Sequence, residues 1–123
     1  MFKNISDIII WSENHRKLAK WYKDKLKLTQ IGEVNHPQDS CIGFRVGSVE
    51  LWIGQHDKVK GKNRDMHRIM YNLVVDSVSE TYKILKKRGV KFFATPFKAP
   101  TFDKYFATFY DGDNNFVQLI GYK

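Results

Sequence analysis

The sequence is poor in cysteine and contains no long hydrophobic run. Its one cysteine, Cys41, excludes an internal disulfide and cannot build a cysteine-rich zinc site. The apolar run Ile8–Trp11 is only as long as a strand, whereas a transmembrane helix needs roughly 20 apolar residues. Residues Met1–Asn4 lack the charged head, apolar stretch and small-residue cleavage site of a signal peptide. We therefore expect a cytoplasmic protein with no membrane segment.

Acidic residues are few relative to basic ones. The 123 residues include 21 Lys and Arg against 13 Asp and Glu, a formal net charge of +8 at pH 7. Lysines cluster at Lys23–Lys27, Lys58–Lys62 and Lys86–Arg88. This excess favours an anionic partner, although lysines spread over helix surfaces and loops are also typical of an ordinary solvated surface. A nucleic-acid-binding module would need exposed aromatic residues beside the lysines. The aromatic side chains here lie on strands and are expected to point inward, so nucleic acid is not an expected partner.

The order strand, helix and three strands occurs twice. The expected strands lie at 5–11, 28–34, 41–46 and 49–54 in the first half and at 69–75, 90–95, 104–110 and 116–121 in the second. In the first half a helix begins after Ser12–Asn14 and presents an apolar face made of Leu18, Trp21, Tyr22 and Leu26. In the second half Ser77 and Glu80 are spaced like a capping box, and Gly89 follows the helix where a C-terminal glycine is favoured.

These elements predict an α+β fold with two βαβββ modules in one domain, residues 1–123. Module one covers about 1–55 and module two about 68–123. The segment of about 56–67, rich in Lys, Gly, Asn and Asp, is the linker between them.

The dipeptide Gly47–Ser48 predicts a hairpin register. A two-residue turn that starts with glycine suits a type II′ hairpin, which places Arg45 opposite Glu50 and Gly43 opposite Trp52. One face of this hairpin is then entirely apolar and should pack on the helices; it comprises Ile42, Phe44, Val46, Val49, Leu51 and Ile53. The other face is mixed, as expected of a face that lines a cleft.

Several stretches together resemble the vicinal oxygen chelate superfamily, which includes the glyoxalases, bleomycin resistance proteins and extradiol dioxygenases. The stretch Trp21–Leu28 is similar to the family's "FYRDxLGL" helix end, and Phe109–Leu119 is similar to its "F-x-D-P-D-G-N-x-x-E-L" ending. The resemblance covers nearly the whole chain. It implies that two repeated, curled mixed sheets surround a cleft, and that the protein forms a homodimer.

The resemblance also implies where a metal would bind. The family's ligand positions correspond to Asp7, Glu50, Met70 and Gln118, and the offsets between corresponding positions, 63 and 68 residues, are similar. Met70 offers a thioether that suits soft metals, and Gln118 is a weak neutral ligand. We therefore predict no bound metal or other cofactor. His67 is out of phase with Met70 and is not expected to face the cleft.

Glu50 has two possible roles. It could be a metal ligand, or it could form a cross-strand ion pair with Arg45, which the hairpin register favours. Aromatic side chains are expected on the cleft side of the strands, and they suit a flat or apolar small molecule, although they could equally fill the core. The predicted cleft residues are Asp7, Trp11, Arg45, Glu50, Trp52, Met70, Phe106, Thr108 and Gln118.

The main functional hypothesis is therefore a small-molecule-binding protein of this superfamily without the usual catalytic metal. The net charge favours a neutral or anionic, aromatic or apolar ligand. The alternative is a metal-dependent lyase, isomerase or dioxygenase, whose divalent metal would act as a Lewis acid toward adjacent substrate oxygens. Asp7, Glu50, Gln118 and a further residue would then hold the metal.

Overall fold

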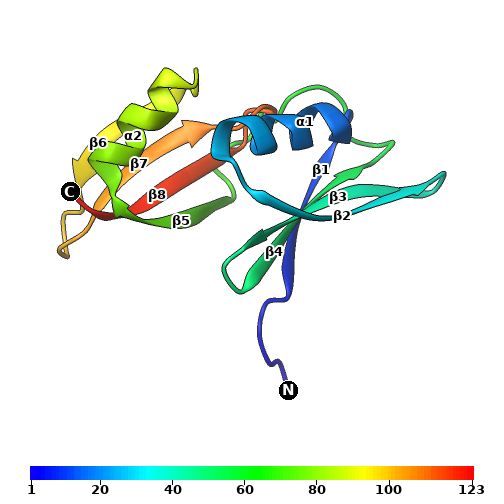
Figure 1. The fold of residues 1–123 in the computed structure, drawn as a ribbon, viewed down its shortest axis with the longest axis horizontal. Coiled ribbons are helices and arrows are strands. Elements are labelled where there is room, and N and C mark those ends of the chain that lie inside the picture. The colour runs from blue at the N-terminus through cyan, green and yellow to red at the C-terminus, as the bar shows by residue number, and fades with distance from the viewer. The chain divides into compact units, whose positions relative to one another are not determined.

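The computed structural model describes residues 1–123, which form two compact units, Met1–Gly61 and Lys62–Lys123 (Figure 1). The boundary between the units lies inside the predicted linker. The chain has no helix that is both long and apolar enough to cross a membrane.

Each unit contains a four-stranded mixed sheet and its own helical segment, so the predicted α+β fold with two βαβββ modules is confirmed. The first unit contains β1 (Asp7–Ser12), α1 (His15–Trp21), the π-helical turn η1 (Tyr22–Leu26), β2 (Thr29–His36), β3 (Asp39–Val46) and β4 (Val49–Gln55). The second contains β5 (Met70–Ser77), α2 (Val78–Lys87), β6 (Phe92–Lys98), β7 (Tyr105–Tyr110) and β8 (Phe116–Tyr122). The strand orders are β1-β4-β3-β2 and β5-β8-β7-β6, and the first strand of each unit pairs in parallel with the last.

The predicted β3–β4 hairpin is confirmed residue by residue. Arg45 pairs with Glu50 and Gly43 with Trp52. Gly47 has φ of +61° whereas Ser48 does not have positive φ, which is the pattern of a type II′ turn rather than type I′. The apolar face packs against α1 as expected, and its most buried members are Ile42, Phe44, Leu51 and Ile53. Leu18, Ala19 and Tyr22 complete this core from the helical side.

The helix ends differ in how well the sequence predicts them. The hydroxyl of Ser77 accepts a hydrogen bond from the Glu80 N–H at 3.1 Å, and Gly89 has φ of +84°. The N–H of Val90 bonds to the Leu85 carbonyl, which completes a Schellman motif. In the first unit the α-helix stops at Trp21, and the π-helical turn ends at Lys27 in the left-handed region, φ +58°.

Several strands run further than the sequence pattern indicates, among them β2, β3 and β6. β2 continues to His36 and β3 begins at Asp39, because polar residues also pair at this exposed end of the hairpin. β6 was expected at 90–95 but spans Phe92–Lys98 and passes through Pro96. An edge strand can accommodate this proline, and the register shift between Ala94 and Phe97 lies at the same place.

Candidate functional site

The face of the first sheet that lies opposite α1 is open and carries five of the predicted cleft residues. The pairing of β1, β4, β3 and β2 arranges its side chains in three rows across the sheet. The rows are Asp7, Glu50, Arg45 and Thr29; then Ile9, Trp52, Gly43 and Gly32; then Trp11, Gly54, Cys41 and Val34. The first row is polar, whereas the other two consist of apolar side chains, glycines and Cys41.

Glycines let both tryptophan rings of this face lie against the sheet. A Cβ atom at Gly43 would stand 2.6 Å from ring carbons of Trp52, and one at Gly54 would stand 2.7 Å from the ring of Trp11. Each indole therefore lies over the glycine of the neighbouring strand, where any side chain would displace it. Trp11 keeps 44% of its surface exposed. We call the two indoles, Trp11 and Trp52, the tryptophan platform.

Glu50 fixes the orientation of the Trp52 ring. The indole N–H donates to Glu50 Oε1 at 2.9 Å, and Arg45 donates to Glu50 Oε2 at 3.1 Å. The predicted Arg45–Glu50 ion pair is therefore present. Because both side chains are partly exposed, the pair itself contributes about 0–1 kcal/mol to stability. Its larger effect is to hold a carboxylate beside the platform with both oxygens already engaged.

Cys41 lies beyond Gly54 in the third row. Burial, together with the nearby Asp39 carboxylate, raises the pKa of the Cys41 thiol above its ordinary value. The thiol consequently stays protonated near neutral pH and is a weak nucleophile. Cys41 therefore suits a small, unreactive position beside Gly54.

The open face of the second sheet contains the other four predicted cleft residues. Gln118 pairs with Thr108 on β7 and donates to its hydroxyl at 3.1 Å. Phe106, on the same face, contacts the rings of Phe97 and Phe102. Met70 lies at the start of β5 and is 44% exposed.

The register of β5 and β8 does not place Met70 directly opposite Gln118. Asp7 pairs with Glu50 in the first unit, but Met70 pairs with Phe116, and Gln118 pairs with Asn72. Asn72 is therefore the residue of β5 that lies directly opposite Gln118, and Met70 lies two residues earlier on the same strand and face.

His67 is also placed differently from the prediction. Its ring makes edge contacts with Phe116 at 4.9 Å and with Phe93 at 5.5 Å between centroids. Phe116 and Gln118 are two residues apart on β8, so both side chains point to the same face of the sheet. His67, which contacts Phe116, therefore lies on the open face of the second sheet. His67 lies before the first residue of β5, so the alternation of side chains along that strand does not determine where it points.

These residues do not fit a catalytic divalent metal. Such a site needs about three protein ligands and an open position. Glu50 has both oxygens engaged, and Asp7 accepts from the Ser6 hydroxyl. In the second unit Met70 is a soft thioether, and Gln118 and its neighbour Asn72 are neutral amides. Residues 1–123 contain no group of three His, Cys, Asp or Glu side chains placed to hold a metal ion.

We expect protein purified without an affinity tag to contain less than stoichiometric zinc, manganese, nickel or iron. Calorimetric titration should show only weak binding of each ion. Of the two carboxylates, Asp7 and Glu50, only Asp7 has an oxygen that is not already engaged, and one carboxylate is too few for a stable site. Elemental analysis measures the metal content of the purified protein, and Asp7→Asn is the matched variant. A stoichiometric metal that is lost in Asp7→Asn would contradict the expectation and favour the metal-dependent enzyme.

The comparisons with known proteins agree with this architecture. The family model described as "Glyoxalase/Bleomycin resistance protein/Dioxygenase superfamily" matches residues 4–119. No curated protein matches the chain significantly in sequence.

Solved structures share the fold at low sequence identity. A glyoxalase family protein from Enterococcus faecalis superposes with a TM-score of 0.80 at 21% identity, over 97% of this chain and 98% of that one. The glyoxylase/bleomycin resistance protein/dioxygenase domain from Frankia sp. EAN1pec gives 0.78 at 16% identity, with all of both chains covered. The genomically encoded fosfomycin resistance protein FosX from Listeria monocytogenes gives 0.76 at 16%, over 100% and 96%. With the family model covering nearly the whole chain and the repeated βαβββ units in place, the protein belongs to the glyoxalase/bleomycin resistance protein/dioxygenase superfamily.

Proposed function

We propose that the protein binds a small planar organic molecule on the tryptophan platform, without a catalytic metal. The observation that supports this most directly is that both indoles lie over glycines of the neighbouring strands. A flat, partly exposed aromatic surface favours stacking with another flat molecule. Because the rings are held in place before the ligand arrives, little conformational entropy is lost on binding.

The hydrogen bond from Trp52 to Glu50 supports the same proposal. An indole N–H usually needs a partner when it is partly buried, and here the carboxylate satisfies it from within the same face. The indole edge is therefore satisfied, and the ring offers a ligand its face rather than its N–H group. Such a surface favours a ligand that is planar and apolar, and it suits an uncharged aromatic ring system in the ligand.

A pair of probes with one carbon skeleton tests the proposal. We expect the planar 2-naphthol to bind with at least about tenfold higher affinity than the non-planar decahydro-2-naphthol, because stacking on one aromatic ring contributes about 1–3 kcal/mol. Trp52→Leu should remove most of that difference. Binding is measured by titration while the indole N–H signals of the three tryptophans are followed by NMR.

Trp21→Phe provides the control, since Trp21 belongs to α1 on the other side of the sheet. It should leave the affinity for 2-naphthol unchanged. Equal affinity for the two probes, or full 2-naphthol affinity in Trp52→Leu, would refute the platform as the binding surface.

A further inference from the structure

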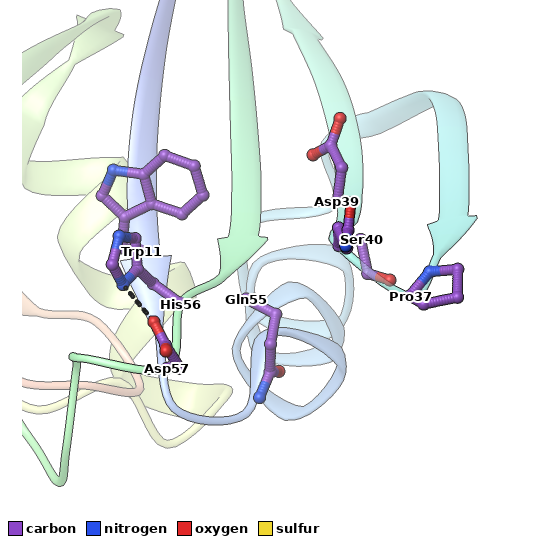
Figure 2. A pocket seen from close by; sticks show the side chains of 8 residues that line it. Trp11, Pro37, Asp39, Ser40, Gln55, His56 and Asp57 are labelled. Atoms are coloured by element: carbon purple, nitrogen blue, oxygen red, sulfur yellow. Dashed lines mark ion pairs between the residues drawn. The ribbon is translucent and has the colours of Figure 1, made fainter.

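A depression lies at the end of the first sheet, beside the platform. Figure 2 shows it between the ends of β1 and β4 and the turn that joins β2 to β3. Its volume is about 580 Å³, within the usual range for small-molecule sites. The lining residues are Trp11, Pro37, Gln38, Asp39, Ser40, Gln55, His56 and Asp57.

Trp11 belongs both to the platform and to this depression. The His56 ring contacts it edge-on, with the centroids 5.2 Å apart and the planes at 77° (Figure 2). A ligand stacked on the platform can therefore extend past Trp11 into the depression without leaving the first unit. The aromatic wall also offers a favourable contact to a cation.

The charges that line the depression have the opposite sign to the charge of the chain. Asp39 and Asp57 contribute carboxylates, and none of the lining residues is Lys or Arg. The long-range field of a +8 chain is screened over about 8–10 Å at physiological salt. The groups in contact with a ligand therefore decide which charge is accepted there.

His56 does not neutralise these carboxylates in its uncharged form. Its Nδ1 accepts a hydrogen bond from the Lys58 backbone N–H at 3.1 Å, and Asp57 Oδ1 lies 3.4 Å from the same nitrogen. An Nδ1 that accepts from Lys58 has no proton to give to Asp57. The Asp57 carboxylate, whose side chain is 90% exposed, then faces the depression with its charge uncompensated by the imidazole.

We propose that this depression is a subsite for the protonated amino group of the ligand whose planar part occupies the platform. The inference rests on the proposed function and narrows it to a planar organic cation. It also revises the expectation of a neutral or anionic ligand, which was based on the net charge of the whole chain. The carboxylates of Asp39 and Asp57, on different sides of the depression, would attract the cation, and the Trp11 ring would contact it.

Three probes that share a naphthalene ring test the charge preference. They are 2-naphthylmethylamine, protonated at pH 7, the neutral 2-naphthalenemethanol and the anionic 2-naphthoate. We expect the amine to bind about fivefold more tightly than the alcohol, the effect of one exposed ion pair. We expect 2-naphthoate to bind more weakly than both.

The variant Asp39→Asn/Asp57→Asn should bring the amine to the affinity of the alcohol, while the alcohol itself is unaffected. The control Asp76→Asn/Asp103→Asn, at two exposed positions of the second unit, makes the same change in net charge and should keep the preference. Raising the salt concentration gives an independent measurement on the unmodified protein, since salt should weaken binding of the amine more than binding of the alcohol.

The outcomes separate this inference from the proposed function. If the alcohol binds and responds to Trp52→Leu but the amine has no advantage, the subsite is refuted and the platform remains. If the amine preference persists in Asp39→Asn/Asp57→Asn, the cation is held elsewhere and the subsite is refuted. If none of the three probes binds, both proposals fail.

Discussion

Replacing Gly121 with alanine is expected to lower the free energy of unfolding by about 3 kcal/mol or more. Gly121 is buried in β8 opposite Val75 of β5, and a Cβ atom there would stand 2.0 Å from the Val75 carbonyl oxygen. Because this neighbour is backbone, no change of rotamer can relieve the contact. The two strands must separate instead, next to the register shift between Val75 and Ser77.

Thermal unfolding followed by circular dichroism measures the effect, and a loss of this size corresponds to roughly 10 °C or more in Tm. Gly43→Ala is the matched control, since its Cβ would meet only side-chain atoms, those of Trp52. That ring can move toward solvent, so the expected loss is about 1 kcal/mol. Equal losses in the two variants would contradict the backbone explanation.

The first hairpin shows how far the sequence alone can lead. Gly47–Ser48 and the apolar alternation on both sides determine the register of β3 against β4, because a shift by one residue would expose every apolar side chain. The partnership of Arg45 and Glu50 follows from that register. All of this information is local, contained in residues 41–54.

The remaining differences arise where the sequence carries no local signal for the structure. The parallel pairing of β5 with β8 joins strands about 45 residues apart, and nothing in either sequence fixes the register that places Asn72, rather than Met70, opposite Gln118. The left-handed residue that ends η1 is Lys27, where the sequence has no glycine or asparagine to indicate it.

The platform could have been partly predicted. Gly32, Gly43 and Gly54 lie inside strands, where glycine often marks the close approach of another group. The strand parity also placed both tryptophans on the cleft side. The hairpin register already placed Trp52 opposite Gly43. What the sequence could not supply is that Trp11 lies over Gly54, since this requires the pairing of β1 with β4 across the helix.

Replacing Gly43 with alanine is expected to weaken binding of 2-naphthol about tenfold, although Trp52 itself is retained. The new methyl group would stand under the centre of the indole, 2.6 Å from its nearest carbons, so the ring must lift away from the sheet. Lifting it strains the hydrogen bond from the indole N–H to Glu50. The flat surface is then lost, and with it about 1.4 kcal/mol of stacking.

A graded comparison separates displacement of the ring from a general effect of added volume. At Gly32 a Cβ would lie 3.3 Å from the outer edge of the same indole, so Gly32→Ala should change the affinity less than twofold. The indole N–H signal of Trp52 should shift strongly in Gly43→Ala and little in Gly32→Ala, while the signal of Trp11 stays in place in both. Unchanged affinity for 2-naphthol in Gly43→Ala, together with a displaced Trp52 signal, would show that the ligand does not stack on this ring. Parallel loss of affinity and displacement of the ring would instead identify the glycines beneath the indoles as the residues that determine whether the site is formed.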